Sequence, residues 1–355
     1  MCIYGDMHIE STITAMQQVK KPHWSHMKAI VYTKYGPPEV LQFKEVAKPV
    51  PKGNEVLVKI YAATVSSEDC TFRMGRPFIA RLATGLFRPK INIPGTNLAG
   101  EIEAVGNEVG KFKPENQVFA ASDENFGAYA EYLCLPEEGA ITLKPENMSY
   151  AEAASICGGG LTALPFLRDA GNIQFGQRIL IIGASGSVGT SAVQISKYFG
   201  AEVTGLCSMT NLELVKSLGA DKVIDYTIED FSKNGETYDI IFDAVGKSSF
   251  SSCKKSLKPS GIYLSTVLTA GIMFNILWTS IFGSKKAKIT FAGLRPAKEK
   301  SKDLIFLKEL AESGIIEPVI DRSYPLDHVV EAHSYVDKGH KKGNVVLTVE
   351  QNSNI

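Results

Sequence analysis

The chain has 355 residues, which is too long for one ordinary hydrophobic core and suits two domains. Its 38 basic and 38 acidic residues cancel, so no overall charge recruits nucleic acid or an anionic membrane. The six cysteines are scattered without a C-x-x-C pair and no secretory leader is evident, which favours the reducing cytoplasm.

The first part of the chain predicts an extension followed by a β domain. Residues 1–26 show no sustained hydrophobic period, so we expect a disordered extension before a first strand that begins at Met27. From there to about Met148, short alternating apolar runs are separated by proline and glycine. This pattern predicts an all-β, barrel-like domain. The clearest runs are Glu55–Tyr61, Gly100–Val105 and Tyr129–Cys134.

The middle of the chain alternates strands and helices. Two predicted helices, Tyr150–Cys157 and Leu161–Ala170, lead to an apolar strand at Arg178–Ile182, a glycine-rich turn and a helix at Ser191–Phe199. Continued alternation is typical of a parallel, doubly wound α/β sheet. The further elements predicted are strands at Glu202–Leu206, Asp221–Ile224, Tyr238–Phe242 and Gly261–Val267, and a helix at Leu212–Leu218.

The glycine-rich turn reads Ile-Ile-Gly-Ala-Ser-Gly-Ser-Val-Gly over residues 181–189. Gly186 leaves room for a pyrophosphate to approach the backbone, and Gly189 lets the following helix pack closely on the strand. The N-terminus of that helix offers free N–H groups to the phosphates. In this strand-turn-helix context the turn predicts a dinucleotide site. Its contacts are Ala184, Ser185, Gly186, Ser187, Val188 and Gly189.

An uncharged stretch runs from Ile262 to Gly283 and is followed by Lys285 and Lys286. Its length and flanks would suit a membrane span. However, its first half coincides with the predicted fifth strand, and a buried parallel strand is expected to be continuously apolar. We therefore predict no membrane span. An apolar lid or interface helix around Phe274–Phe282 stays open for the second half.

The last part of the chain, after about Pro296, predicts two helices and one strand. They lie at Asp303–Ser313, Asp327–Lys338 and Asn344–Val349.

Several motifs occur in a fixed order from Met27 almost to the end of the chain. They are Met27-Lys-Ala-Ile, Asp69-x-x-x-Arg-x-Gly75, Gly95-x-x-x-Ala-Gly-Glu-Ile-Glu-Ala-Val-Gly106, Gly127-Ala-Tyr-Ala-Glu-Tyr132, Leu161-Thr-Ala163, Ala184-x-Gly-x-x-Gly189, Leu218-Gly-Ala-Asp221, Asp243-Ala-Val-Gly246 and Gly343-Asn-Val-Val346.

With these motifs the chain resembles the medium-chain dehydrogenase/reductase superfamily, in its zinc-free quinone oxidoreductase (zeta-crystallin-like) branch. The resemblance implies a GroES-like β-barrel catalytic domain made from residues 27–148 and 297–355. It also implies a doubly wound Rossmann domain over residues 149–296, with the nicotinamide and the substrate in the cleft between the domains. Members of this branch pair through the edge strand of the Rossmann sheet, so we expect a homodimer through the neighbourhood of Gly261–Val267.

Zinc members of the superfamily carry a cysteine shortly before an aspartate and, later, a Gly-His-Glu motif. The corresponding residues here are Ser66 before Asp69, and Gly95-Thr96-Asn97. Cys157 lies near a third ligand position, but a zinc site needs three or four protein ligands. His333 is expected on a solvated helix face. We therefore predict no catalytic or structural zinc.

A site without a zinc Lewis acid favours acceptors that spread the developing negative charge themselves. Quinones and α,β-unsaturated carbonyls do this. The predicted function is therefore a zinc-independent, NADPH-dependent reduction of quinones or enones. Two alternatives stay open: a catalytically weak NADPH-binding protein, like the lens crystallins of the superfamily, and a zinc-type alcohol dehydrogenase.

Relatives often carry Asn where Ser66 stands and Tyr where Thr71 stands, at the nicotinamide end of the cleft. We expect Ser66 and Thr71 to position the substrate and the nicotinamide, without a firm general acid. Asp69 is expected to fix its own turn by hydrogen bonds from its side chain to the backbone.

The residues after the second Rossmann strand decide between cofactors, because an acidic side chain there would repel a 2′-phosphate. The segment Cys207-Ser-Met-Thr-Asn211 contains no acid, so NADPH is favoured, with NADH as the alternative. Ser208 can donate to a phosphate, and the resemblance adds further cofactor contacts. These are Thr162, Tyr226, Gly246, Ser265, Thr266 and Asn344.

Overall fold

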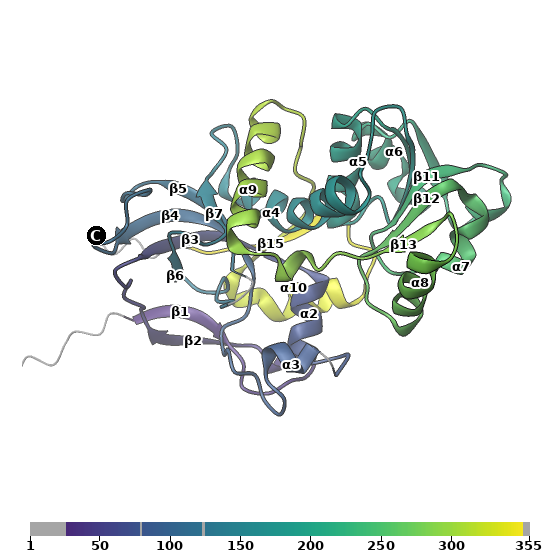
Figure 1. Ribbon diagram of the computed structural model, residues 1–355. Coiled ribbons are helices and arrows are strands. Elements are labelled where there is room, and N and C mark those ends of the chain that lie inside the picture. The colour runs from purple at the N-terminus through teal and green to yellow at the C-terminus, as the bar shows by residue number, and fades with distance from the viewer. Residues whose placement is uncertain (1–25, 79, 123–124, 351–355) are drawn as a thin grey trace, which may run out of the picture.

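The computed structural model describes residues 26–78, 80–122 and 125–350 (Figure 1). The predicted extension, residues 1–26, lies outside the described residues except for His26, which opens the first strand. Two sheet-based parts lie side by side, a β domain that holds both ends of the described chain and an α/β domain (Figure 1).

The β domain is built from a seven-stranded sheet and a two-stranded sheet. The C-terminal strand β15 inserts beside β3 in antiparallel register, with Val345 opposite Val65. This pairing gives the end of the chain its place in the β domain. The strands are β1 (His26–Val31), β2 (Gln42–Ala47), β3 (Glu55–Val65), β4 (Asn97–Val105), β5 (Gln117–Ala121), β6 (Tyr132–Pro136), β7 (Ile141–Leu143), β14 (Ile320–Pro325) and β15 (Asn344–Thr348).

The α/β domain holds a six-stranded sheet with strands in the order β10-β9-β8-β11-β12-β13. All pairs are parallel, and this order is that of a doubly wound dinucleotide fold. The strands are β8 (Arg178–Ile182), β9 (Glu202–Cys207), β10 (Lys222–Asp225), β11 (Tyr238–Asp243), β12 (Leu257–Ser265) and β13 (Lys286–Lys288).

The sixth strand, β13, corrects the predicted sheet edge. The Gly261–Val267 neighbourhood was expected at the edge, but β12 pairs with β11 on one side and with β13 on the other. The sequence signal for β13 is weak, because only three residues with two lysines among them form it. An edge-to-edge homodimer would therefore involve β13.

Helix α4 (Tyr150–Pro165) corrects the expectation of two helices, because it runs unbroken through three glycines before a π-helical turn at Phe166–Ala170. These glycines permit close packing. A Cβ on Gly159 would lie 2.5 Å from the carbonyl oxygen of Ser187, and one on Gly160 would lie 2.6 Å from Leu307 Cδ1. Leu307 belongs to α9 (Ala297–Glu312), so the glycines bring α4 against its neighbours.

The other helices lie around the two sheets. The uncharged stretch predicted from the sequence forms the end of β12 and then α8. Within the described residues, no helix combines the length and apolar character needed to cross a bilayer. The helices are α2 (Ser67–Met74), α3 (Ala80–Thr84), α5 (Ser187–Tyr198), α6 (Leu212–Ser217), α7 (Phe250–Cys253), α8 (Ala270–Ile281) and α10 (Val329–Asp337).

His333 is fully buried where α10 packs on α2, so the expectation of a solvated position is wrong. It shares the inward face of α10 with Val329, Ala332 and Val336. The Arg73 guanidinium donates to His333 Nδ1 at 3.0 Å and forms an ion pair with Asp337. Burial, with a smaller contribution from the Arg73 charge, lowers the pKa of His333 to about 3.

This burial predicts an acid sensitivity. The unfolded chain takes up a proton at His333 below about pH 6.5, whereas the folded chain does so only near pH 3. Neutral His333 thus contributes fully to the free energy of unfolding above pH 6.5, and this contribution is lost as the pH falls toward 3. We expect this group to lower the free energy of unfolding by about 2 kcal/mol between pH 7.5 and pH 5.

Urea unfolding at the two pH values measures this loss. His333→Gln should show a smaller pH dependence than the unmodified protein, whereas His328→Gln, at an exposed histidine, should retain it. Equal pH dependence in all three proteins would contradict the assignment.

Candidate functional site

The glycine turn, defined here as residues 183–189, connects β8 to α5. Helix α5 begins at Ser187 rather than at the predicted Ser191, because Gly186 in extended conformation already serves as its N-cap. Ser187, Val188 and Gly189 therefore belong to the first helical turn. No side chain caps this N-terminus, so its backbone N–H groups face outward for an anionic ligand.

The two glycines of the motif have different surroundings. A Cβ on Gly186 would meet only the Gly183 carbonyl oxygen, at 3.6 Å. A Cβ on Gly189 would lie 2.1 Å from the same oxygen and 2.7 Å from Ala184 Cα. Open space at Gly186 and tight packing at Gly189 fit a turn that admits a pyrophosphate.

The C-terminal segment is hydrogen-bonded to this turn. The Gly343 N–H donates to the Ser185 carbonyl oxygen at 2.8 Å, and the Ser187 hydroxyl donates to Asn344 Oδ1 at 2.6 Å. Asn344 also donates through its backbone N–H to Val319 at 2.8 Å. The turn therefore lies where the α/β domain meets the β domain, with Asn344 beside it.

Ser208 lies just past β9 and is connected to the turn by Asn211, a residue that the sequence did not single out. The Asn211 amide donates to Ser185 Oγ at 3.0 Å and to Ser208 Oγ at 3.2 Å. Asn211 is buried, and its Oδ1 has no hydrogen-bond partner among the described residues. This oxygen is an acceptor available to a ribose hydroxyl. The signal in the sequence was an amide side chain four residues after the end of a sheet strand.

Asp225 brings an acid close to the end of β9, although the segment after β9 contains none. It ends β10 opposite Cys207, and burial together with its charge raises the pKa of the Cys207 thiol to about 11. Thr227 donates to Asp225 Oδ1 twice, and Oδ2 is buried without a partner in the described part of the chain. Tyr226, the next residue, is exposed. Sequence reasoning missed this acid because a neighbouring strand supplies it.

Asp243 organises the loop that follows β11 and is fully buried. Its carboxylate accepts hydrogen bonds from four backbone N–H groups and one phenol, so it fixes the loop as a rigid unit. We assign it a positioning role that the sequence motif alone did not reveal. The donors, at 2.8–3.3 Å, are Val245, Gly246, Lys247, Ser248 and Tyr263.

The same loop brings three predicted contacts together. Gly246 adopts φ +66°, and a Cβ there would lie 2.4 Å from Val267 Cγ2. The Thr266 N–H donates to the Asp243 carbonyl oxygen at 3.1 Å, and Ser265 ends β12. These residues occupy the carboxyl ends of parallel strands, the edge at which doubly wound sheets bind ligands.

Ser66 and Thr71 use their hydroxyls within α2. Ser66 is the N-cap: its hydroxyl donates to Asp69 Oδ2 at 2.6 Å, and the Asp69 N–H donates back to Ser66 Oγ at 3.0 Å. The hydrogen bonds predicted for Asp69 are therefore present, because its Oδ2 also accepts from the Ser66 N–H at 2.8 Å. The Thr71 hydroxyl donates to the Ser67 carbonyl oxygen at 2.9 Å.

The sheet register places Ser66 at the level of the glycine turn. Val65 pairs with Val345 in antiparallel register, so Ser66 follows β3 where Asn344 begins β15. The Thr162 hydroxyl donates to the Gly158 carbonyl oxygen within α4 at 3.0 Å.

The described residues contain no group of three or more His, Cys, Asp or Glu side chains arranged to hold a metal ion. Thr96 and Asn97 stand where zinc members carry the His and Glu of the Gly-His-Glu motif, and the Asn97 amide donates to Thr96 Oγ1 at 3.2 Å. Ser66 at another such position caps α2. None of these side chains suits zinc, so the donor set does not fit the ion.

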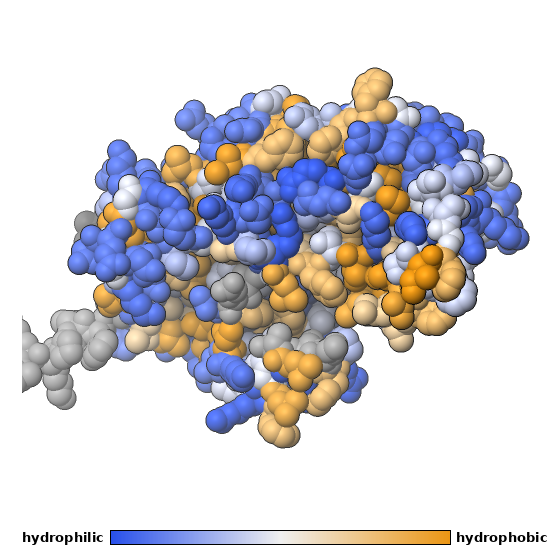
Figure 2. All heavy atoms as spheres, in the orientation of Figure 1, coloured by the Kyte–Doolittle hydropathy of each residue, from blue (hydrophilic) through white to orange (hydrophobic). Residues whose placement is uncertain are grey.

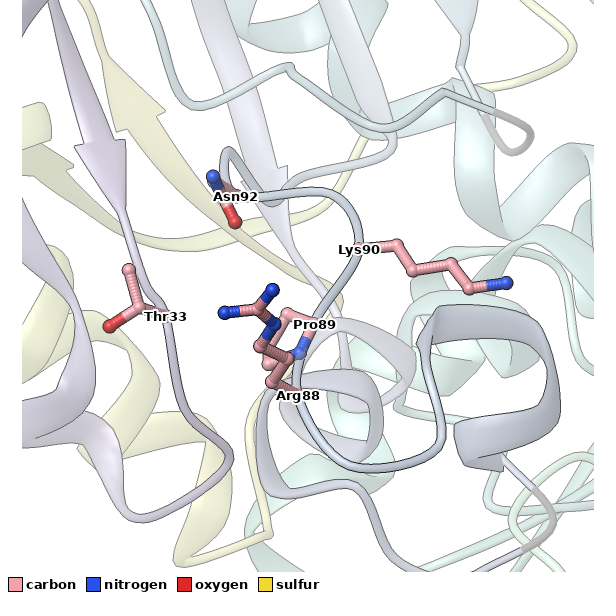
Figure 3. Close-up of a pocket in the computed structure, with 5 residues that line it drawn as sticks. All are labelled: Thr33, Arg88, Pro89, Lys90 and Asn92. Carbon is pink, nitrogen blue, oxygen red and sulfur yellow. The ribbon is translucent and has the colours of Figure 1, made fainter.

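An open pocket of about 400 Å³ lies elsewhere, between the end of β1 and the segment after α3 (Figure 3). None of the predicted site residues lines it, and Lys90 points away from Thr33 (Figure 3). Its lining residues are Thr33, Arg88, Pro89, Lys90 and Asn92.

Comparison with known proteins covers nearly the whole chain. Residues 218–347 match a zinc-binding dehydrogenase family model, and residues 52–145 match an alcohol dehydrogenase GroES-like domain. A 2-methylene-furan-3-one reductase of Solanum lycopersicum is 35% identical over 91% of this chain and 79% of its own. A chloroplastic NADPH-dependent alkenal/one oxidoreductase of Arabidopsis thaliana is 32% identical over 90% of this chain and 79% of its own.

Among solved structures, the quinone oxidoreductase of Coxiella burnetii superposes with a TM-score of 0.81 at 29% identity. The match covers 92% of this chain and 100% of that one. The chain therefore belongs to the medium-chain dehydrogenase/reductase superfamily, in its zinc-free quinone oxidoreductase branch, and is a nicotinamide-dependent oxidoreductase.

Proposed function

We propose that this chain uses NADPH to reduce quinones or α,β-unsaturated carbonyls without zinc. The observation that carries the proposal is the open space at Gly186 beside an uncapped helix N-terminus, with Asn344 held against the same turn. The names of the Coxiella burnetii and Arabidopsis thaliana relatives support the two acceptor classes.

When bound, the nicotinamide would supply a hydride from its C4. The glycine turn would hold the pyrophosphate through the N–H groups of α5, and Asn211 Oδ1 would accept from a ribose hydroxyl. The loop organised by Asp243 would support the nicotinamide end, with Ser66 at the level of Asn344. The contribution of these residues is to orient the cofactor and the acceptor.

We assign no general acid to Ser66 or Thr71. Both hydroxyls already donate within α2, at 2.6 Å and 2.9 Å. Their role is to position the acceptor, and the proton that completes the reduction comes from water. Acceptors that delocalise the developing charge suit such a site.

The proposal favours NADPH over NADH because no acid stands directly after β9, where Ser208 can meet a 2′-phosphate. The Asp225 carboxylate, which lies on the neighbouring strand, keeps NADH as the alternative.

We also propose a cytoplasmic homodimer paired through β13. The free thiols of Cys70, Cys134, Cys207 and Cys253 suit a reducing compartment.

The activity itself is the first test. Purified protein should oxidise NADPH in the presence of 9,10-phenanthrenequinone or a short enal, and 1,10-phenanthroline should leave the rate unchanged. Metal analysis should find no stoichiometric zinc. Binding of NADPH without turnover on any acceptor would favour the crystallin-like alternative. About one tightly held zinc per chain would favour the alternative of a zinc-type alcohol dehydrogenase.

The glycine turn allows a matched pair of substitutions. Gly186→Val should place a branched side chain against the pyrophosphate and weaken NADPH binding by about tenfold or more, while the chain stays folded. Gly189→Ala should instead lower the free energy of unfolding by about 1–3 kcal/mol, because its Cβ collides with backbone. Fluorescence titration and thermal denaturation measure the two effects. Unchanged NADPH affinity in Gly186→Val would show that the turn is not the cofactor site.

Cofactor preference depends on Ser208. Ser208→Asp should weaken NADPH binding by about tenfold or more and leave NADH binding unchanged or stronger, because a carboxylate repels the 2′-phosphate. Ser217→Asp, the same change on the exposed end of α6, is the control and should alter neither affinity. If Ser208→Asp weakened the binding of NADPH and NADH equally, Ser208 would not be part of a 2′-phosphate site.

A further inference from the structure

Helix α8 exposes an unusually apolar surface. One face, which we name the α8 face, carries six large apolar side chains that are each between 49% and 66% exposed. Only Ile272 and Thr279 are buried beneath it. Figure 2 shows the orange surface of α8 on the lower right of the molecule. The six residues are Met273, Phe274, Leu277, Trp278, Ile281 and Phe282.

The aromatic rings of the α8 face form a continuous row. Phe274 stacks on Trp278 with centroids 6.2 Å apart, and Trp278 lies 5.0 Å from Phe282. Their spacing of four residues places them on one side of the helix. A helix of a water-soluble domain normally turns such a row toward the core, so this row is arranged for contact with something outside the chain.

Positive charges predominate in the segment around this helix, although the whole chain is neutral. Residues 244–298 include nine lysines and arginines and no aspartate or glutamate. Lys285 lies at the C-terminal end of α8, and its Nζ donates to the Lys254 carbonyl oxygen at 2.7 Å. Lys254 and Lys255 are exposed, and among the described residues neither forms an ion pair. Two of the nine charges are compensated, because Lys258 pairs with Asp239 and Arg295 pairs with Asp303. The positive charges left beside the α8 face include Lys254, Lys255 and Lys285.

We propose that the α8 face docks on an anionic lipid bilayer, with the helix lying in the plane of the membrane surface. Exposed Trp and Phe side chains favour the headgroup region, and lysines beside them attract acidic headgroups. Twelve residues form α8, a length of about 18 Å, which suits a helix lying on the surface and not one that crosses.

The positive border distinguishes this occupant from a second copy of the chain. A symmetric dimer through the α8 face would add Lys254, Lys255 and Lys285 of both copies to one interface, to which residues 244–298 of neither copy supply an acidic partner. Like charges so placed oppose association. An anionic membrane satisfies both the apolar row and the charge.

A second apolar surface on α3 and its flanks lies on the same lower side of the view as α8 (Figures 1 and 2). Phe78, Leu82 and Phe87 are exposed there. Residues 70–100 also lack aspartate and glutamate while they include five lysines and arginines. Two apolar, basic surfaces on one side would orient the protein on the membrane.

The test uses full-length protein and vesicles of phosphatidylcholine with or without about one-third phosphatidylglycerol. We expect sedimentation with the anionic vesicles only, weakened at high salt. In a Trp24→Phe background, the remaining Trp278 should shift its fluorescence to shorter wavelength when these vesicles are added. No sedimentation and no shift would overturn the proposal.

Two variants locate the contact. Lys254→Glu/Lys255→Glu should reduce vesicle binding by about 30-fold or more, whereas Lys44→Glu/Lys113→Glu, the same charge change on exposed lysines of the β domain, should have little effect. Phe274→Ser/Trp278→Ser should also lose binding while its circular dichroism stays native. If sedimentation velocity shows that this last variant turns a dimer into a monomer, a second copy covers the face and the proposal is wrong. None of these readouts depends on turnover.

Discussion

The arrangement of the site depends on the contact between the glycine turn and the C-terminal segment. The hydrogen bonds from Gly343 to Ser185 and from Ser187 to Asn344 join residues that are more than 150 positions apart. They bring the helix N-terminus that suits a pyrophosphate against the sheet from which Ser66 emerges. Because β15 pairs with β3 and Asn344 is hydrogen-bonded to the glycine turn, any shift of the C-terminal strand would affect Ser66 and the turn together.

Buried polar groups hold the loops around this contact. Asp243 gathers the backbone of the loop after β11, and Asn211 connects the turn to the segment after β9. The Asp243 carboxylate and the amide N–H groups of Asn211 are hydrogen-bonded within the chain, so the loops are preorganised without a ligand. The hydroxyls of Ser66 and Thr71 are used in the same way, for structure within α2. In the proposed reaction, such a site orients the reactants and leaves charge delocalisation to the acceptor.

The proposed membrane surface adds a physical reason for the acceptor class. Quinones and enones are largely apolar and dissolve in lipid, so a reductase that rests on a bilayer would meet them at high local concentration. The neutral overall charge of the chain conceals this local excess of positive charge, because the acidic residues that balance the lysines of residues 244–298 lie in other parts of the chain.

The sequence alone determined the features that depend on local pattern. Strand β8 and the alternation of the α/β domain follow from apolar runs and a glycine turn that are contiguous in the chain, and the Asp69 hydrogen bonds follow from a cap four residues long. Only the tertiary structure decided features that depend on distant neighbours. The glycines of α4 accommodate Leu307 and Ser187, His333 is buried by α2, Asp225 reaches the end of β9 from the next strand, and β13 forms the sheet edge. Local pattern fixes what a segment can form, whereas burial and charge at a site are set by the elements packed against it.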